Sequence, residues 1–204
     1  MITSGELLPG QQIRQEGMAE KLGVSRLPVR EALRELTADG LVTHTPNVGY
    51  SVARLSADEF QQIYLMRELL EAEVIKSLPR LTDEELAHVE RLNTAVIEAA
   101  DDADIAAMRV ANHDFHFAIF RKSSLELVVG EIERLWRWAS PYHAAYLSSP
   151  ASRLQILEEH QGMIEALRRG DNQSLVELMA LHREGAGKQI GPTLKQGALP
   201  IILT

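Results

Sequence analysis

The 204-residue chain has no cysteine, only 5% aromatic residues and no long hydrophobic run. Without cysteine it can form no disulfide bond, no thiolate metal site and no cysteine nucleophile. It also lacks the run of about 20 apolar residues that a membrane helix needs, and its N-terminus lacks the basic and then apolar pattern of a secretory signal. We therefore expect a soluble cytoplasmic protein and no membrane partner.

An excess of positive charge is absent as well. The chain holds 21 basic and 29 acidic residues, for a net charge of −8, which excludes a protein covered by nucleic acid over most of its surface. Residues 1–54 hold six basic and six acidic residues, so the whole acidic excess belongs to residues 55–204. Only the N-terminal part is suited to approach a polyanion such as DNA.

The N-terminal part has the pattern of two short helices followed by a hairpin. The helical segments cover residues 14–22 and 26–38, and glycine separates them. Two β-branched segments, 41–45 and 50–53, flank a four-residue turn at Pro46–Gly49. This order of elements predicts a winged helix-turn-helix domain over residues 1–54.

From residue 55 onward the hydrophobic period is helical throughout. Capping boxes at Ser56 and Thr82 mark the first two helix starts, and short polar connections favour an antiparallel bundle whose interior can hold a ligand or a metal. We therefore expect a mainly α fold with an antiparallel six-helix bundle over residues 55–190 and an irregular tail over 191–204. The expected helices lie near residues 56–77, 82–100, 104–121, 125–147, 152–169 and 172–190.

Three arginines recur every four residues along the second helix. Arg26, Arg30 and Arg34 share one helix face. In a winged helix-turn-helix the N-terminal end of this helix enters the major groove, where Arg26 and Arg30 can reach guanine edges or phosphates. The alternative is a solvated face neutralised by neighbouring glutamates, and Ser25 serves either as the N-cap or as a phosphate contact.

The same region carries a family pattern. A Pro-Gly pair at residues 9–10 precedes the first helix, and Leu-Gly-Val-Ser-Arg-Leu-Pro-Val-Arg-Glu-Ala-Leu covers residues 22–33. This pattern resembles the DNA-binding domain of the GntR family of bacterial transcription regulators. That family has a full helix before the Pro-Gly pair, and the eight residues here imply a truncated or absent helix. The DNA contacts that the resemblance implies are Arg14, Ser25, Arg26 and Arg30, with Asn47 and Gly49 at the wing tip.

Three of the seven histidines have informative spacings. His116 follows Asn112 by four residues, so both lie on one helix face. His160 and His182 both lie about 15 Å from the turn at Gly170, and they are level if the last two helices form a hairpin. This set is typical of a transition-metal site in a bundle core, and imidazole suits Zn, Ni, Mn or Fe. The alternative is that these histidines are polar fillers of the core.

These residues resemble a second domain of the same family. The pattern Asn-x-x-Phe-His ending at His116, the Glu-His pair ending at His160 and the closing His182 resemble the helical effector domain of the FadR-like branch. The six-helix count resembles the shorter version of that domain. Many of its members hold a divalent metal, and the resemblance implies Asn112, His116, His160 and His182 as ligands, with Zn as the first expectation. Asparagine in place of the common aspartate removes one anion, so we expect weaker or more selective metal binding.

Seven of the ten aromatic residues lie between residues 115 and 146. Core filling explains most of them, but polar-tipped aromatic side chains beside a metal with open positions suit a small carboxylate such as a sugar acid, keto acid or hydroxy acid. Arg67 lies where family members often have an arginine in the effector cavity, and the alternative is a helix pair with Glu71. The candidate effector contacts are Arg67, Arg137, Tyr142 and Arg121, with Arg109 and Arg153 as weaker candidates.

The leading interpretation is a transcriptional regulator, repressor or activator, that acts as a homodimer on double-stranded operator DNA. A small carboxylate bound near the divalent metal would control its operator affinity. One alternative is a metal-dependent hydrolase or oxygenase, although the sequence has no His-Glu-x-x-His motif or similar general base. The other alternative is a constitutive DNA-binding module whose helical part is purely structural.

Overall fold

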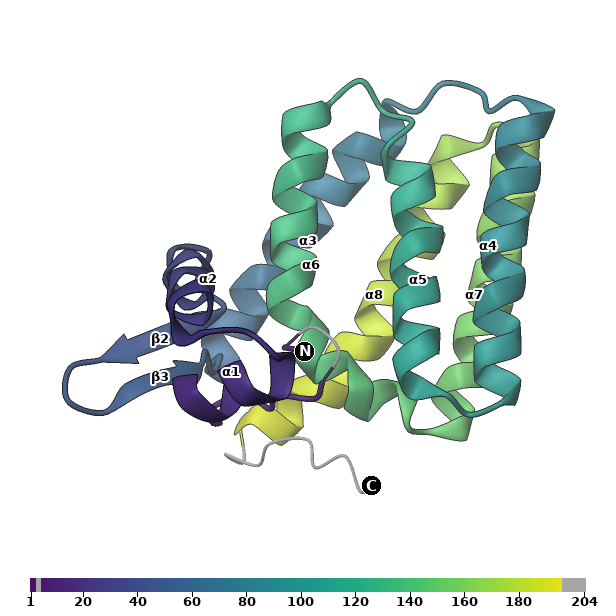
Figure 1. The fold of residues 1–204 in the computed structure, drawn as a ribbon. Helices are drawn as coiled ribbons and strands as arrows, with labels where there is room; N and C mark the ends of the chain where they lie inside the picture. The colour runs from purple at the N-terminus through teal and green to yellow at the C-terminus, as the bar shows by residue number, and fades with distance from the viewer. Residues whose placement is uncertain (3–4, 196–204) are drawn as a thin grey trace. The chain divides into compact units, whose positions relative to one another are not determined.

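A computed structural model describes residues 1–2 and 5–195, without the side chains of residues 144, 145, 193 and 195. Contacts divide the chain into two compact units, Met1–Ser56 and Ala57–Thr204. The first unit holds a winged helix-turn-helix and the second holds six helices (Figure 1).

The first unit follows the predicted order of two helices and a hairpin. Gly23 has a φ of 66°, the left-handed conformation that ends the first helix and allows the tight turn. Ala19, Val29, Leu33 and Val42 are buried and belong to its small core. The elements are β1 (Gln12–Ile13), α1 (Gln15–Leu22), α2 (Arg26–Ala38), β2 (Val42–Thr45) and β3 (Gly49–Val52).

The wing differs from the prediction in two details. Its antiparallel sheet has the strand order β1-β3-β2, and β1 was not predicted because two residues are too short to show a period. The turn is one residue shorter than predicted, because Gly49 pairs with Thr45 and joins the ladder. No helix precedes β1 among the described residues, which agrees with the expected truncation.

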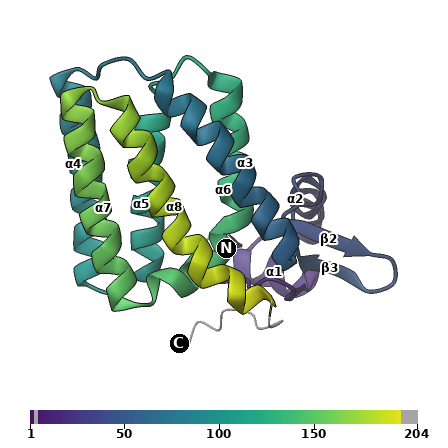
Figure 2. The ribbon, with the colours of Figure 1, turned by 180° about the vertical axis from the view of Figure 1, so that it is seen from behind.

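The second unit is an antiparallel bundle in two layers. One layer contains α6, α5 and α4, and the other contains α3, α8 and α7, with α8 packed between its two neighbours (Figures 1 and 2). Every helix begins within two residues of its predicted start. The bounds are α3 (Ala57–Lys76), α4 (Asp83–Asp101), α5 (Ile105–Phe120), α6 (Glu126–Leu147), α7 (Pro150–Arg169) and α8 (Asn172–Lys195).

Local sequence signals place these helices. Thr82 and Glu85 form the predicted capping box: the Glu85 N–H donates to Thr82 Oγ1 at 3.3 Å, and the Thr82 N–H donates to Glu85 Oε2 at 2.9 Å. Gly170 has a φ of 68° and ends α7, so that α7 and α8 form a hairpin. The hairpin brings His160 level with His182, as their spacing from the turn predicts, with ring centroids 5.1 Å apart.

The last helix is longer than predicted. We expected an irregular tail over residues 191–204, but α8 continues to Lys195 with Pro192 inside it. A proline removes one backbone donor, and packing of the helix offsets this loss; Ile190 and Leu194 are both buried. The rest of the predicted tail lies outside the described residues.

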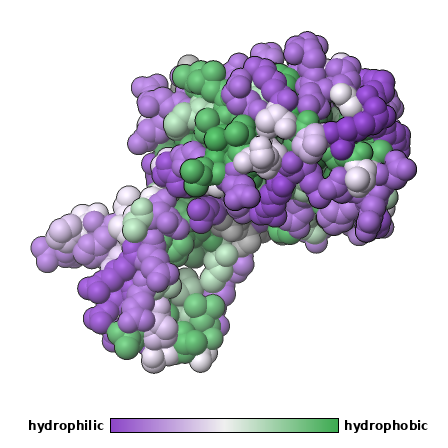
Figure 3. Space-filling model, turned by 90° about the horizontal axis from the view of Figure 1, so that it is seen from above, coloured by the Kyte–Doolittle hydropathy of each residue, from purple (hydrophilic) through white to green (hydrophobic). Residues whose placement is uncertain are grey.

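Aromatic side chains fill much of the bundle core. Phe115, Phe117 and Phe120 on α5 are buried, as are Trp136 and Tyr142 on α6. The face seen in Figure 3 is mostly hydrophilic, with hydrophobic residues in small groups. Within the described part of the chain, no helix combines the length and the apolar character needed to cross a bilayer.

Candidate functional site

Three of the four predicted metal ligands meet inside the bundle. His116 from α5, His160 from α7 and His182 from α8 offer nitrogen atoms that all lie within 4.8 Å of one another. The first two side chains have no exposed surface, and His182 is 8% exposed. The three helices therefore bring their histidines together in one buried cluster of imidazoles.

Hydrogen bonds orient two of these imidazoles. His160 Nδ1 donates to Asn93 Oδ1 at 2.9 Å, and His182 Nδ1 donates to Glu159 Oε2 at 2.7 Å. Both rings therefore carry their proton on Nδ1 and leave Nε2 available as a ligand. Neither of these two supporting residues was predicted from the sequence. Glu159 directly precedes a predicted ligand, which is a usable signal, whereas Asn93 is distant in sequence and lies on α4.

The fourth predicted ligand, Asn112, lies one turn before His116 on α5. Its Oδ1 is buried and has no hydrogen-bond partner among the described residues, and the same is true of His160 Nε2. An unpartnered buried polar atom costs about 1–3 kcal/mol. These atoms therefore indicate a ligand that the chain itself does not supply.

The chemistry of the cluster fits a divalent transition metal. His116 Nε2 and His182 Nε2 lie 3.1 Å apart, close to the separation of two nitrogen ligands that share an ion at about 2.1 Å. Burial, together with neighbouring histidines, lowers the pKa of His116 and of His160 well below the usual value. Both imidazoles are therefore neutral, the form that binds a metal.

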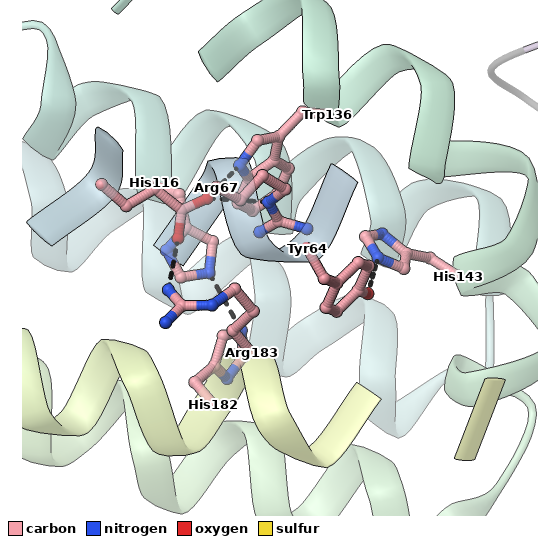
Figure 4. A network of polar contacts seen from close by, with 8 residues as sticks. Tyr64, Arg67, His116, Trp136, His143, His182 and Arg183 are labelled. Carbon is pink, nitrogen blue, oxygen red and sulfur yellow. Dashed lines mark hydrogen bonds and ion pairs between the residues drawn. The ribbon is translucent and has the colours of Figure 1, made fainter. Parts of the chain in front are cut away.

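A buried ionic network surrounds Glu71 of α3 and includes Arg67 of α3, Trp136 of α6 and Arg183 of α8, the three of which are labelled in Figure 4. Arg67 Nε donates to Glu71 Oε1 at 2.7 Å, Arg183 donates to Oε2 at 3.0 Å, and Trp136 Nε1 donates to Oε1 at 2.8 Å. Burial alone would raise the pKa of Glu71, but the two guanidinium groups hold it below its usual value. The predicted helix pair of Arg67 and Glu71 is therefore present.

Arg67 also lies close to the histidine cluster. Its guanidinium is 4.3 Å from the centroid of the Trp136 ring, and that ring lies 5.1 Å from the ring of His116. Its charge acts on His116, contributing to the lowered pKa of that histidine. Arg67 can therefore pair with Glu71 and also lie beside the proposed metal site.

A half-buried pair, not predicted from the sequence, joins α3 and α6. The Tyr64 hydroxyl and His143 Nε2 form a hydrogen bond of 2.9 Å (Figure 4). Burial raises the pKa of Tyr64 to about 12. Burial, and then the positive charge of Arg67, lowers the pKa of His143 to about 3. This pair is therefore neutral at physiological pH.

The other predicted effector contacts lie in different surroundings. Tyr142 is buried and meets the Phe60 ring edge-on at 5.9 Å, a core contact. Arg121 has 55% of its side chain exposed and pairs with a glutamate of α6 at 3.2 Å. Arg137 is half-buried on α6. The structure therefore does not bring Arg121 into the buried network.

Three of the predicted DNA contacts line one hollow on the first unit. Arg14, Arg26 and Gly49 border a cavity of about 500 Å³ between the start of α1, the start of α2 and the wing. Arg26 Nη1 lies 3.6 Å from Glu16 Oε1, with both side chains largely exposed. Such an exposed ion pair is weak, so it leaves this arginine available for a polyanion.

The other three predicted DNA contacts are exposed. Ser25 occupies the N-cap position of α2, but its side chain makes no capping hydrogen bond. Arg30 projects from α2 one turn after Arg26. Asn47 lies at the wing tip with a φ of 63°, a conformation that asparagine tolerates better than most residues. All three side chains are therefore accessible to DNA.

Comparisons with known proteins give two domain matches, to the gntR family of bacterial regulatory proteins over residues 1–52 and to the FCD domain over residues 62–185. The HTH-type transcriptional regulator McbR of Escherichia coli (strain K12) is 26% identical over 182 residues, which cover 88% of this chain and 82% of McbR. The Nta operon transcriptional regulator of Aminobacter aminovorans is 32% identical over 147 residues, which cover 68% and 69% of the two chains.

A solved structure shows the same fold. The crystal structure of a GntR transcriptional regulator from Rhodococcus sp. RHA1 superposes with a TM-score of 0.80 at 24% identity and covers 93% of this chain and 91% of that one. The order of the two matched domains agrees with the winged helix-turn-helix and the helical bundle. The chain is a transcriptional regulator of the GntR family with a C-terminal FCD domain.

Proposed function

We propose that a small carboxylate, bound beside a divalent metal in the bundle, controls the affinity of this regulator for operator DNA. The observation that carries the proposal is the buried cluster of His116, His160 and His182 with its unpartnered ligand atoms. As a regulator of DNA the protein would work in the cytoplasm, as a homodimer on a pseudo-palindromic operator.

The proposed metal ligands are the three histidines and Asn112. Imidazole and amide donors suit Zn, and also Ni, Mn or Fe. The ion, when bound, supplies a positive centre that attracts carboxylate oxygens. Asn93 and Glu159 hold two of the rings in the ligating orientation, which is the usual role of residues that support a metal site.

The charge around the cluster favours an anionic effector. Arg67 and Arg183 place two buried guanidinium groups around the single carboxylate of Glu71, which leaves one positive charge in excess. In a buried site an uncompensated cation is costly and attracts an anion. A small carboxylate would neutralise this excess positive charge and would also occupy the open coordination positions of the metal.

The link to DNA runs along the chain. β3 ends at Val52 and α3 begins at Ala57, and α3 carries Tyr64, Arg67 and Glu71 of the buried networks. An effector can change operator affinity only if it binds the DNA-competent and incompetent states with different free energies. We infer that α3 is the element whose position differs between these states, with Arg14, Ser25, Arg26, Arg30, Asn47 and Gly49 as the DNA contacts.

The test is an operator titration with DNA from the region around the protein's own gene. Metal-loaded and chelator-treated protein are titrated with and without acetate, lactate, gluconate and glutarate. We expect at least one acid to change the operator affinity of the metal-loaded protein by about 5–150-fold, the range of typical allosteric coupling. A response that survives chelation unchanged would contradict the role of the metal.

The Arg67→Met variant locates the response. We expect it to keep metal and operator binding and to lose the effect of the acid, because its guanidinium lies beside the cluster. Arg121→Met, on the exposed end of α5, is the matched control and should respond like the parent. If the acid still changes the operator affinity of Arg67→Met fully, Arg67 is only the helix partner of Glu71.

A further inference from the structure

Arg109 on α5 is a buried cation to which the proposed function gives no role. The residue is 7% exposed, and its Nη2 is buried without a hydrogen-bond partner. Among the described residues no hydrogen bond or ion pair of any kind involves this side chain. Its burial lowers its pKa, although an arginine remains charged at physiological pH. A buried, unpaired charge of this kind is costly and is normally compensated.

Arg109 shares a helix face with the proposed metal ligands. It precedes Asn112 by three residues and His116 by seven, which is close to two full turns. At about 1.5 Å per residue, the backbone positions of Arg109 and His116 lie about 10 Å apart along α5. The guanidinium, the amide and the imidazole therefore follow one another along the same side of the helix.

The charges around His143, which include that of Arg109, are positive. His143 on α6 is subject to the charges of Arg67, His182 and Arg109, and no carboxylate acts on it. The carboxylate of Glu71 already holds two arginines. Burial is the one cause that lowers the pKa of Arg109, and no acidic side chain among the described residues pairs with it. The partner it lacks is therefore an anion.

We propose that Arg109 is a second anion anchor and that the effector is a small molecule with two carboxylates, one at the metal and one at Arg109. This inference rests on the proposed function and narrows its ligand class. The two-turn separation of Arg109 and His116 along α5 favours a ligand whose carboxylates are several bonds apart. Glutarate or adipate should bind more tightly than malonate, whose carboxylates are too close together to reach both anchors.

The test is calorimetric titration of the full chain, loaded with Zn²⁺, with glutarate and with pentanoate, its analogue that has one carboxylate fewer. We expect glutarate to bind at least about tenfold more tightly, because one charge-assisted contact is added. In Arg109→Met the two acids should bind within about twofold of each other, whereas Arg121→Met should keep the preference of the parent.

A stability measurement separates recognition from a structural role. Because methionine removes an unpaired buried charge, Arg109→Met without ligand should melt at the same temperature as the parent or higher. A lower melting temperature would overturn the proposal, because it would show that Arg109 stabilises the free protein.

The outcomes also separate this inference from the proposed function. Equal binding of glutarate and pentanoate by the metal-loaded parent would overturn the second anchor and leave a carboxylate effector in place. A preference for glutarate that survives in Arg109→Met would do the same. A parent that takes up no Zn²⁺, or that binds neither acid once loaded, would overturn the proposed function together with this inference.

Discussion

The two units of the molecule carry their candidate functional residues in opposite ways. In the first unit Arg26 and Arg30 are exposed side chains on α2. In the second unit His116, His160 and Glu71 are completely buried and join helices to one another. Exposed positions tolerate substitution with little loss of stability, whereas buried polar networks do not. Binding and stability should therefore change separately in the DNA-binding unit and together at the histidine cluster and at Glu71 of the helical unit.

The largest effect is expected at the centre of the buried network. Glu71→Leu leaves Arg67 and Arg183 buried without their carboxylate, which should lower the free energy of unfolding by about 3–5 kcal/mol. Urea unfolding measures this loss. Glu133→Leu breaks the exposed pair with Arg121 and should cost at most about 1 kcal/mol. Equal losses in the two variants would show that the network around Glu71 is not desolvated.

A smaller effect is expected in the pH dependence of the stability of the helical unit. His143 has a pKa of about 3 in the folded state and about 6.5 in the unfolded chain. The unfolded chain therefore binds the extra proton first, and stability falls as the pH drops from 6.5 towards 3. His143→Gln should reduce the loss between pH 7 and pH 5 by about 2 kcal/mol, at about 1.4 kcal/mol per pH unit. An unchanged loss in urea unfolding would contradict the lowered pKa of this histidine.

In the DNA-binding unit only affinity should change. Arg30→Ala should weaken operator binding by about 1–3 kcal/mol if the side chain reads a base, with no change in melting temperature because the side chain is exposed. Arg34→Ala, one turn further from the groove, is the matched control and should cost less. Gel-shift titration at fixed salt together with a melting curve tests both. A lower melting temperature with unchanged operator affinity would show that Arg30 stabilises the fold and does not bind DNA.

The smallest effects are expected at the starts of two helices, α4 and α2. Thr82 caps α4 through its side chain, so Thr82→Ala should cost about 1 kcal/mol of stability. Ser25 makes no capping bond on α2, so Ser25→Ala should weaken operator binding with little change in stability. Unfolding and gel-shift measurements on both variants are the check. A larger stability loss at Ser25 would show that it is a structural cap.

Much of the fold could be predicted from local signals. Gly23, Gly170 and the capping box at Thr82 fix helix ends within a few residues, so the helix starts agree with the structure. β1 and the extension of α8 through Pro192 could not be predicted in the same way. Both depend on what a short segment packs against, which lies elsewhere in the chain.

The candidate site shows the same division. The meeting of His160 and His182 follows from equal distances to one turn, which the sequence contains. Asn93 and His143 have no such signal, because their partners come from helices distant in sequence. The burial of Arg109 without an anion could not be predicted either, because periodicity shows which residues share a face but not which of them lack a partner.

The histidine cluster of the helical unit should hold one divalent ion per chain, and elemental analysis measures this content directly. Purified full-length protein is incubated with Zn²⁺, dialysed and measured beside His160→Ala and the exposed control His88→Ala. We expect about one ion per chain in the parent and the control, and a large loss in His160→Ala, because that variant removes a ligand. Equal metal content in the parent and His160→Ala, or no metal in the parent, would show that the histidine cluster is not a metal site.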